Sequence, residues 1–103
     1  DSPVIACLGL SYKADIDDLR QSPAVTVVRD LSEAGHTVLA VEPHIDALPP
    51  ELEGLDGVTL AGLDEALDQA RIIVLLVDHK VFKDVAEDRR VDKTVFDARG
   101  VWR

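Results

Sequence analysis

Short runs of consecutive apolar residues recur along the chain. They predict strands over residues 4–8, 37–41, 58–60, 72–77 and 94–96. The longest runs are continuously apolar rather than alternating, which is typical of strands buried on both faces of a parallel sheet. The strand pattern therefore favours a sheet that is covered by helices on both sides.

The segments between these runs carry apolar residues at helical spacing. Ser22 and Pro23 predict a helix start, because serine caps helix N-termini and proline suits the first helical position, and Gly35 predicts its end. Further helices are expected over residues 64–70 and from Val81 to about Arg89, and residues 44–56 form a loop with room for a short helical turn. Alternating strands and helices predict a single α/β domain with a doubly wound, Rossmann-like, mostly parallel sheet.

Composition narrows the classes of partner. The chain has 103 residues and a net charge of −9, which argues against general binding to nucleic acid or to anionic membranes. The longest apolar run, residues 72–77, is too short to span a bilayer. No signal peptide is apparent, and the single cysteine cannot form an internal disulfide, so a cytoplasmic setting is the expectation.

Several residues that could carry chemistry have a structural interpretation instead. Cys7 lies in the middle of a predicted strand, so its thiol is expected to be buried and neutral rather than nucleophilic. His44 and His79 follow strands, but no cysteine or acid stands at ligand spacing, so no metal site is predicted and both histidines are expected to be structural or exposed. Trp102 is expected to be a packing anchor.

The segment between the first strand and the first helix is the strongest candidate for a binding site. Doubly wound sheets bind ligands beyond the carboxyl ends of their strands, and a connection there usually takes about 2 to 6 residues. This one is about twice as long, and it holds Lys13 and Arg20, two of the three cations among residues 1–70, which carry 14 acids. It leads into a helix N-terminus, so it could wrap a phosphate. Its cations could equally pair with its own aspartates, and spacing alone leaves both interpretations open.

A second candidate follows the last predicted strand. Arg99 stands in the segment of residues 97–100, next to Gly100, which permits close approach of the backbone to a ligand. An ordinary turn that ends the sheet is the alternative.

One long motif resembles a known family. Residues 9–24 read Gly-Leu-Ser-Tyr-Lys-Ala-Asp-Ile-Asp-Asp-Leu-Arg-Gln-Ser-Pro-Ala. They are similar to the signature that opens the third domain of the UDP-glucose/GDP-mannose dehydrogenases, roughly Gly-Leu-Ala-Phe-Lys, a spacer and Asp-Asp-x-Arg-Glu-Ser-Pro-Ala. The resemblance continues through residues 41–43, 76–79, 82–83 and 97–103, and so covers essentially the whole chain. Residues 77–79 and 100–103 most resemble the branch that uses UDP-N-acetyl-D-mannosamine. Ser11, Tyr12 and Gln21 depart from the usual pattern.

The resemblance implies that residues 1–103 are the C-terminal UDP-sugar-binding domain of a three-domain, NAD-dependent UDP-sugar 6-dehydrogenase serving bacterial surface polysaccharide synthesis. Tyr12 and Lys13 would contact the UDP-sugar, and Arg99 would bind its nucleotide portion. Arg20 would reach NAD, which is held mainly by the N-terminal domain. The family's catalytic cysteine belongs to the middle domain, so no catalytic residue is expected here. Both other domains would be partners, in a homo-oligomeric enzyme, and this domain alone would be inactive.

Other functions are compatible with parts of the pattern. The same family includes enzymes acting on UDP-glucose or UDP-N-acetylglucosamine. A stand-alone nucleotide-binding module would share the fold. A phosphoacceptor receiver domain could use Asp17 and Asp18 as paired acids and Asp78 as phosphoacceptor, but those paired acids should follow the first strand directly, and here they come eight residues after Gly9.

Overall fold

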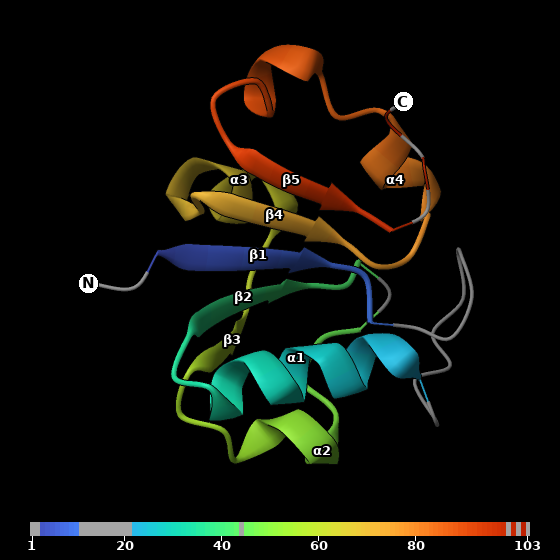
Figure 1. Ribbon diagram of the computed structural model, residues 1–103. Coiled ribbons are helices and arrows are strands. Elements are labelled where there is room, and N and C mark those ends of the chain that lie inside the picture. Colours follow the sequence, from blue (N-terminus) through green and yellow to red (C-terminus); the bar gives the residue numbers. More distant parts are fainter. Residues whose placement is uncertain (1–2, 11–21, 44, 99, 101, 103) are drawn as a thin grey trace.

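A parallel sheet forms the centre of the molecule (Figure 1). The computed structural model describes residues 3–10, 22–43, 45–98, 100 and 102. Within them the strands are β1 (Val4–Leu8), β2 (Thr37–Val41), β3 (Val58–Leu60), β4 (Ile72–Leu75) and β5 (Thr94–Asp97). Their order across the sheet is β3-β2-β1-β4-β5, and every neighbouring pair is parallel. The predicted doubly wound α/β fold is confirmed.

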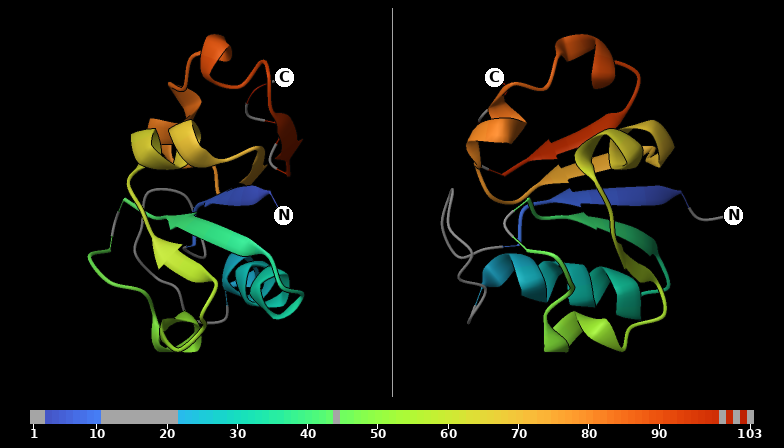
Figure 2. Two further views of the ribbon diagram at one scale, coloured as in Figure 1. Left: turned by 90° about the vertical axis from the view of Figure 1, so that its left-hand side faces the viewer. Right: turned by 180° about the vertical axis from the view of Figure 1, so that it is seen from behind.

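Helices cover both faces of this sheet (Figure 2). They are α1 (Pro23–Glu33), α2 (Pro50–Glu53), α3 (Leu63–Gln69) and α4 (Lys80–Lys83), with a 3₁₀ turn over Glu87–Arg89. Alternate residues of β1 point to opposite faces of the sheet. Ile5 and Cys7 pack against residues of α1 and α2. Ala6 and Leu8 pack against residues of α3 and α4. Burial on both faces is what the continuous apolar runs predicted. None of the helices in the described part of the chain is long and apolar enough to cross a membrane.

Helix α1 begins and ends where its local signals predicted. Ser22 is the N-cap, and its Oγ accepts a hydrogen bond from the backbone N–H of Ala24 at 3.2 Å. Pro23 occupies the first helical position, where its missing N–H costs nothing. Beyond the C-terminus Gly35 has a φ of +97°, a left-handed conformation that glycine adopts without strain. The caps therefore determine the bounds of this helix.

The helix predicted from Val81 to about Arg89 is wrong. Helix α4 ends at Lys83, and Ala86 is extended, with φ −68° and ψ 149°, before the 3₁₀ turn begins. The carbonyl of Phe82, which a continuing α-helix would pair with the N–H of Ala86, accepts the N–H of Val85 at 3.3 Å and the indole N–H of Trp102 at 2.8 Å. A local turn and a contact with a residue 20 positions later thus take the place of the helical hydrogen bond.

The strand order decides between two kinds of doubly wound domain. Receiver domains have the flavodoxin-like order 2-1-3-4-5, whereas this sheet has the Rossmann order 3-2-1-4-5. The receiver alternative is therefore excluded. The chain leaves β1 toward β2 on one side and later returns to β4 on the other, so the topological switch point lies at the carboxyl ends of β1 and β4.

Candidate functional site

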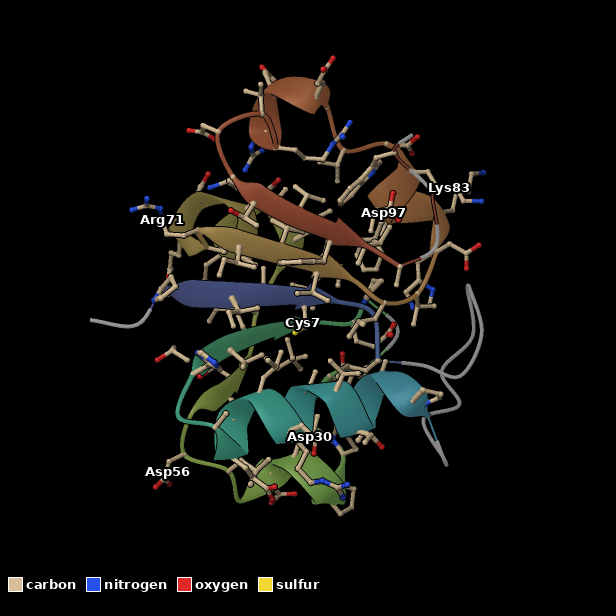
Figure 3. All side chains as sticks on the ribbon, in the orientation of Figure 1. Cys7, Asp30, Asp56, Arg71, Lys83 and Asp97 are labelled. Carbon is tan, nitrogen blue, oxygen red and sulfur yellow. The ribbon has the colours of Figure 1, made fainter. Side chains whose placement is uncertain are left out.

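The carboxyl ends of four strands lie at one edge of the sheet. Leu8 at the end of β1 is in register with Val41 of β2 and with Leu75 of β4, and Leu75 is in register with Asp97 of β5. Figure 3 shows Asp97 at this edge and Arg71 at the opposite one. The segments that follow these strands therefore share one edge, as the parallel fold predicted.

Gly9 packs against β4 at the switch point. Its φ is +100°, and its N–H donates to the carbonyl of Val41 at 2.7 Å. A Cβ on Gly9 would lie 2.5 Å from the Cβ of Val77, closer than any side chain tolerates. The N–H of Val77 in turn donates to the carbonyl of Leu8 at 3.3 Å. Only glycine fits between the two strand ends, so the start of the long segment after β1 has a defined direction.

A buried acid and a buried histidine meet beside Gly9. Oε1 of Glu42, the residue after β2, lies 2.8 Å from the backbone nitrogen of Leu10 and 2.8 Å from Nε2 of His79. Both side chains are fully buried, with 0% of their surface exposed. The backbone N–H of Leu10 donates to this oxygen, and Nε2 of His79 lies within hydrogen-bonding distance of the same atom. The structural interpretation of His79 is confirmed, and its partner Glu42 is a residue that the sequence analysis missed.

The sequence contains only a weak indication that Glu42 and His79 are in contact. Glu42 and His79 each follow a buried strand, and in a doubly wound sheet these two strands flank β1. The separation of 37 residues hides the contact from any reasoning about local spacing.

Buried groups hold both ends of the segment that carries Lys13. Leu10, before it, is fully buried and bonded to Glu42, and Ser22, after it, is 3% exposed and caps α1. The predicted ligand-binding residues Tyr12, Lys13 and Arg20 themselves lie outside the described residues.

Asp97, at the end of β5, is hydrogen-bonded to Trp102. Oδ2 of Asp97 accepts the backbone N–H of Trp102 at 2.8 Å. The Trp102 ring packs against the α3–α4 core, and the Arg90 guanidinium lies 4.6 Å from its centre. Trp102 is thus confirmed as a packing anchor. Arg99 lies outside the described residues.

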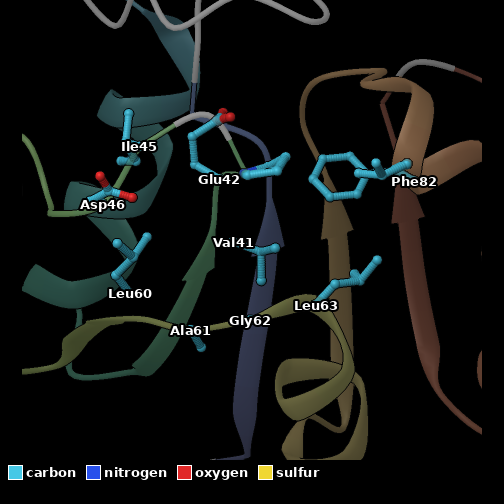
Figure 4. Close-up of a pocket in the computed structure, with 11 residues that line it drawn as sticks. Val41, Glu42, Ile45, Asp46, Leu60, Ala61, Gly62, Leu63 and Phe82 are labelled. Atoms are coloured by element: carbon cyan, nitrogen blue, oxygen red, sulfur yellow. The ribbon is translucent and has the colours of Figure 1, made fainter.

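A cavity of about 440 Å³ opens between the ends of β2 and β3 and helix α4 (Figure 4). Figure 4 shows Ile45 and Leu60 on one side and Leu63 and Phe82 on the other. The remaining lining residues are Val41, Glu42, Pro43, Asp46, Ala61, Gly62 and Val81. Among the described residues these walls are mostly apolar, with two acids and no lysine or arginine, so this part of the cavity suits a neutral ring better than a phosphate. A diphosphate would need cations from elsewhere at this edge.

Neither a metal centre nor a nucleophile appears in the described part of the chain. No group of three histidine, cysteine, aspartate or glutamate side chains lies close enough there to hold a metal ion. Cys7 is free and buried, and burial raises the pKa of its thiol to about 12. The predicted neutral cysteine is confirmed. His44 lies outside the described residues.

The described residues at the switch point do not match the pattern of a dinucleotide site. Rossmann sites approach the pyrophosphate through several glycines after the first strand and bind the ribose with an acid near the end of the second. Here Gly9 abuts Val77, and Glu42, the acid after β2, is fully buried with its Oε1 bonded to Leu10 and His79. The described residues therefore do not form an NAD site of their own.

The chain is thus a Rossmann-like domain whose described strand ends differ from those of a dinucleotide site. The family model described as the UDP-glucose/GDP-mannose dehydrogenase family, UDP binding domain, matches residues 6–103. The chain belongs to this family, and the resemblance of its motifs is confirmed.

Known relatives agree with this assignment. The chain is 52% identical over 101 residues to the NDP-N-acetyl-D-galactosaminuronic acid dehydrogenase of Ralstonia solanacearum, with 97% of this chain covered, and 50% identical to the UDP-N-acetyl-D-mannosamine dehydrogenase of Escherichia coli K12, with 96% covered. It spans only 23% of the length of either protein.

Solved structures show the same fold. The NDP-N-acetyl-D-galactosaminuronic acid dehydrogenase of Methanosarcina mazei superposes over 100% of this chain and 22% of its own, with a TM-score of 0.77 and 25% identity. The UDP-D-ManNAc dehydrogenase of Pyrococcus horikoshii covers 99% of this chain, matched by 23% of its own, with a TM-score of 0.75 and 27% identity.

Proposed function

We propose that this domain binds the sugar nucleotide in an NAD-dependent UDP-sugar 6-dehydrogenase. The observation that carries the proposal is the match of a UDP-binding family model to residues 6–103. The preferred substrate is UDP-N-acetyl-D-mannosamine, oxidised at C6 to UDP-N-acetyl-D-mannosaminuronate for surface polysaccharides. The 50% identity to the Escherichia coli UDP-N-acetyl-D-mannosamine dehydrogenase supports this choice.

Four residues of this chain would serve the site. Tyr12 and Lys13 contact the UDP-sugar, and Arg99 binds its nucleotide portion. Lysine acts as a compact charge on phosphate, whereas arginine can bind two oxygens at once. Arg20 reaches NAD held by the N-terminal domain, where the hydride is accepted. This division agrees with the absence of phosphate-binding cations from the described cavity.

The decisive substitution for the substrate role is Lys13→Ala in the full-length enzyme. Loss of a charged hydrogen bond to phosphate should raise the KM for the UDP-sugar by about tenfold or more, with little change in thermal stability. The matched control is Arg29→Ala, which removes an exposed cation from α1 in the same acidic half of the chain. An unchanged KM in Lys13→Ala, measured by NADH formation, would contradict the assignment.

The NAD role of Arg20 is tested separately. Arg20→Ala should weaken NAD binding by several-fold and leave the KM for the UDP-sugar within about twofold. Titration of the same full-length variant with NAD decides the point, because normal affinity would remove this role from Arg20.

A second substrate is favoured by a specific observation. The relative at 52% identity is named an NDP-N-acetyl-D-galactosaminuronic acid dehydrogenase, so an N-acetylgalactosamine nucleotide is the alternative. Comparing kcat/KM for the UDP derivatives of N-acetylmannosamine, N-acetylgalactosamine, N-acetylglucosamine and glucose ranks the candidates. Highest kcat/KM with UDP-glucose would contradict both amino-sugar proposals.

The remaining parts of the enzyme complete the proposal. The N-terminal and middle domains supply the NAD site and the nucleophile, in a cytoplasmic homo-oligomer. A cleft between domains loses one wall when a domain is removed, so the 103-residue chain alone should form no NADH from a UDP-sugar and NAD.

A further inference from the structure

Three backbone segments converge on one carboxylate at the switch point. Glu42 follows β2, Leu10 follows β1 and His79 lies just beyond β4, and Oε1 of Glu42 lies 2.8 Å from both the Leu10 nitrogen and the His79 ring nitrogen. These contacts join positions that are 32 and 37 residues apart in the sequence. One buried oxygen therefore ties together the ends of the three central strands.

Burial makes the geometry of this contact specific. The side chains of Glu42 and His79 are both 0% exposed, and Leu10 is fully buried among the residues under α1. A carboxylate away from water needs its hydrogen bonds, so the Leu10 N–H cannot move from it without cost. The His79 ring also contacts Phe82, with 5.4 Å between ring centres, which holds the histidine from the α4 side.

Leu10 is the last described residue before segment 11–21, which carries the proposed substrate ligands. Gly9 is locked against Val77, so the Glu42–Leu10 hydrogen bond is the next constraint along the chain. Ser22 is the corresponding buried anchor on the far side. The last described residue before this segment is thus held by the side chain that follows a neighbouring strand.

We propose that Glu42, held by His79, is a positioning residue for substrate binding, because the carboxylate that grips the Leu10 N–H orients the backbone leading to Lys13. In this role it acts through the Leu10 backbone rather than as a catalytic residue. The inference rests on the proposed function, since it assumes that Lys13 binds the UDP-sugar.

The test compares three substitutions in the full-length enzyme. Glu42→Leu removes the acceptor at similar size and should raise the KM for the UDP-sugar by about tenfold or more, because small misplacements of binding groups are costly. Glu42→Gln keeps an acceptor oxygen for Leu10 and should restore most of the affinity. Val38→Ala, a fully buried position near the opposite end of β2, destabilises the same strand and should leave the KM unchanged.

The pair should also behave as a unit. His79→Leu should raise the same KM, and the double variant with Glu42→Leu should be no worse than the worse single variant, since both changes release the same backbone. The KM for NAD should stay within about twofold throughout.

Each result decides the question. An unchanged KM in folded Glu42→Leu, an equal rise in Glu42→Gln, or an equal rise in Val38→Ala overturns the positioning role. If Glu42→Leu does not fold, Glu42→Asp replaces it. A raised KM for the UDP-sugar in Glu42→Asp together with a normal KM in Glu42→Gln supports the positioning role. Normal KM values in both variants overturn it. Lys13→Ala is measured in parallel. If that variant binds normally the proposed function fails, whereas a weakened Lys13→Ala with normal Glu42 variants removes only this inference.

Discussion

Gly9 and Gly35 share a backbone conformation but not an environment. Their φ values are +100° and +97°, and a Cβ at Gly9 would meet Val77 at 2.5 Å while one at Gly35 would meet nothing within 4 Å. Gly35→Ala should therefore cost only the left-handed strain, about 1 to 2 kcal/mol. Gly9→Ala adds overpacking and should cost about 2 to 5 kcal/mol in the free energy of unfolding. Urea unfolding of the two variants measures the difference; equal losses would show that Val77 moves aside freely.

Cys7 gives the chain a predictable response to alkali. Burial raises the pKa of its thiol from the ordinary 9.0 to about 12, so between these values the unfolded chain loses a proton that the native chain keeps. Stability contributed by this group is therefore complete below pH 9.0 and falls as pH rises, by about 1.4 kcal/mol per pH unit. Cys7→Ala should lack this component, so the stability difference between wild type and variant should shrink with pH. A constant difference would mean that the thiol is not buried.

At the scale of elements, the cap of α1 can be tested directly. Ser22→Ala removes the Oγ that accepts the Ala24 N–H and should lower the free energy of unfolding by about 1 kcal/mol. Ser32→Ala, near the other end of the same helix, serves as the control and should be neutral or slightly stabilising, because alanine is the better helix former. Equal losses, measured by thermal or urea unfolding, would contradict the capping role.

Elements whose signals are local were predictable, and those ended by distant contacts were not. Ser22, Pro23 and Gly35 bound α1 within a few residues of the chain itself. The predicted strand over residues 72–77 stops at Leu75, because the N–H groups of Leu76 and Val77 both turn to the Leu8 carbonyl. Helix α4 also ends earlier than predicted, and there the Phe82 carbonyl accepts the N–H of Val85 and the distant indole N–H of Trp102.

For the molecule as a whole, the distribution of charge and the shape of the cavity indicate that different parts of the sheet edge suit different parts of a ligand. Residues 1–70 hold 14 acids and three cations, and the described cavity carries acids without cations. The proposed binding of an anionic sugar nucleotide would then depend in this half of the chain on a few cations, which agrees with the proposed role of Lys13. Because the chain spans 23% of the length of its relatives, the opposite wall of that site is proposed to come from the other domains.

The sequence by itself determined the alternation of buried strands and capped helices, the neutral core position of Cys7, and the long motif that identifies the family. These are matters of local periodicity and residue type, which the chain carries wherever it folds. The strand order 3-2-1-4-5 and the meeting of Glu42, Leu10 and His79 are visible only in the folded molecule. Contacts across 32 and 37 residues depend on which strands pack side by side, and hydrophobic pattern is the same for every order in which buried strands can be arranged.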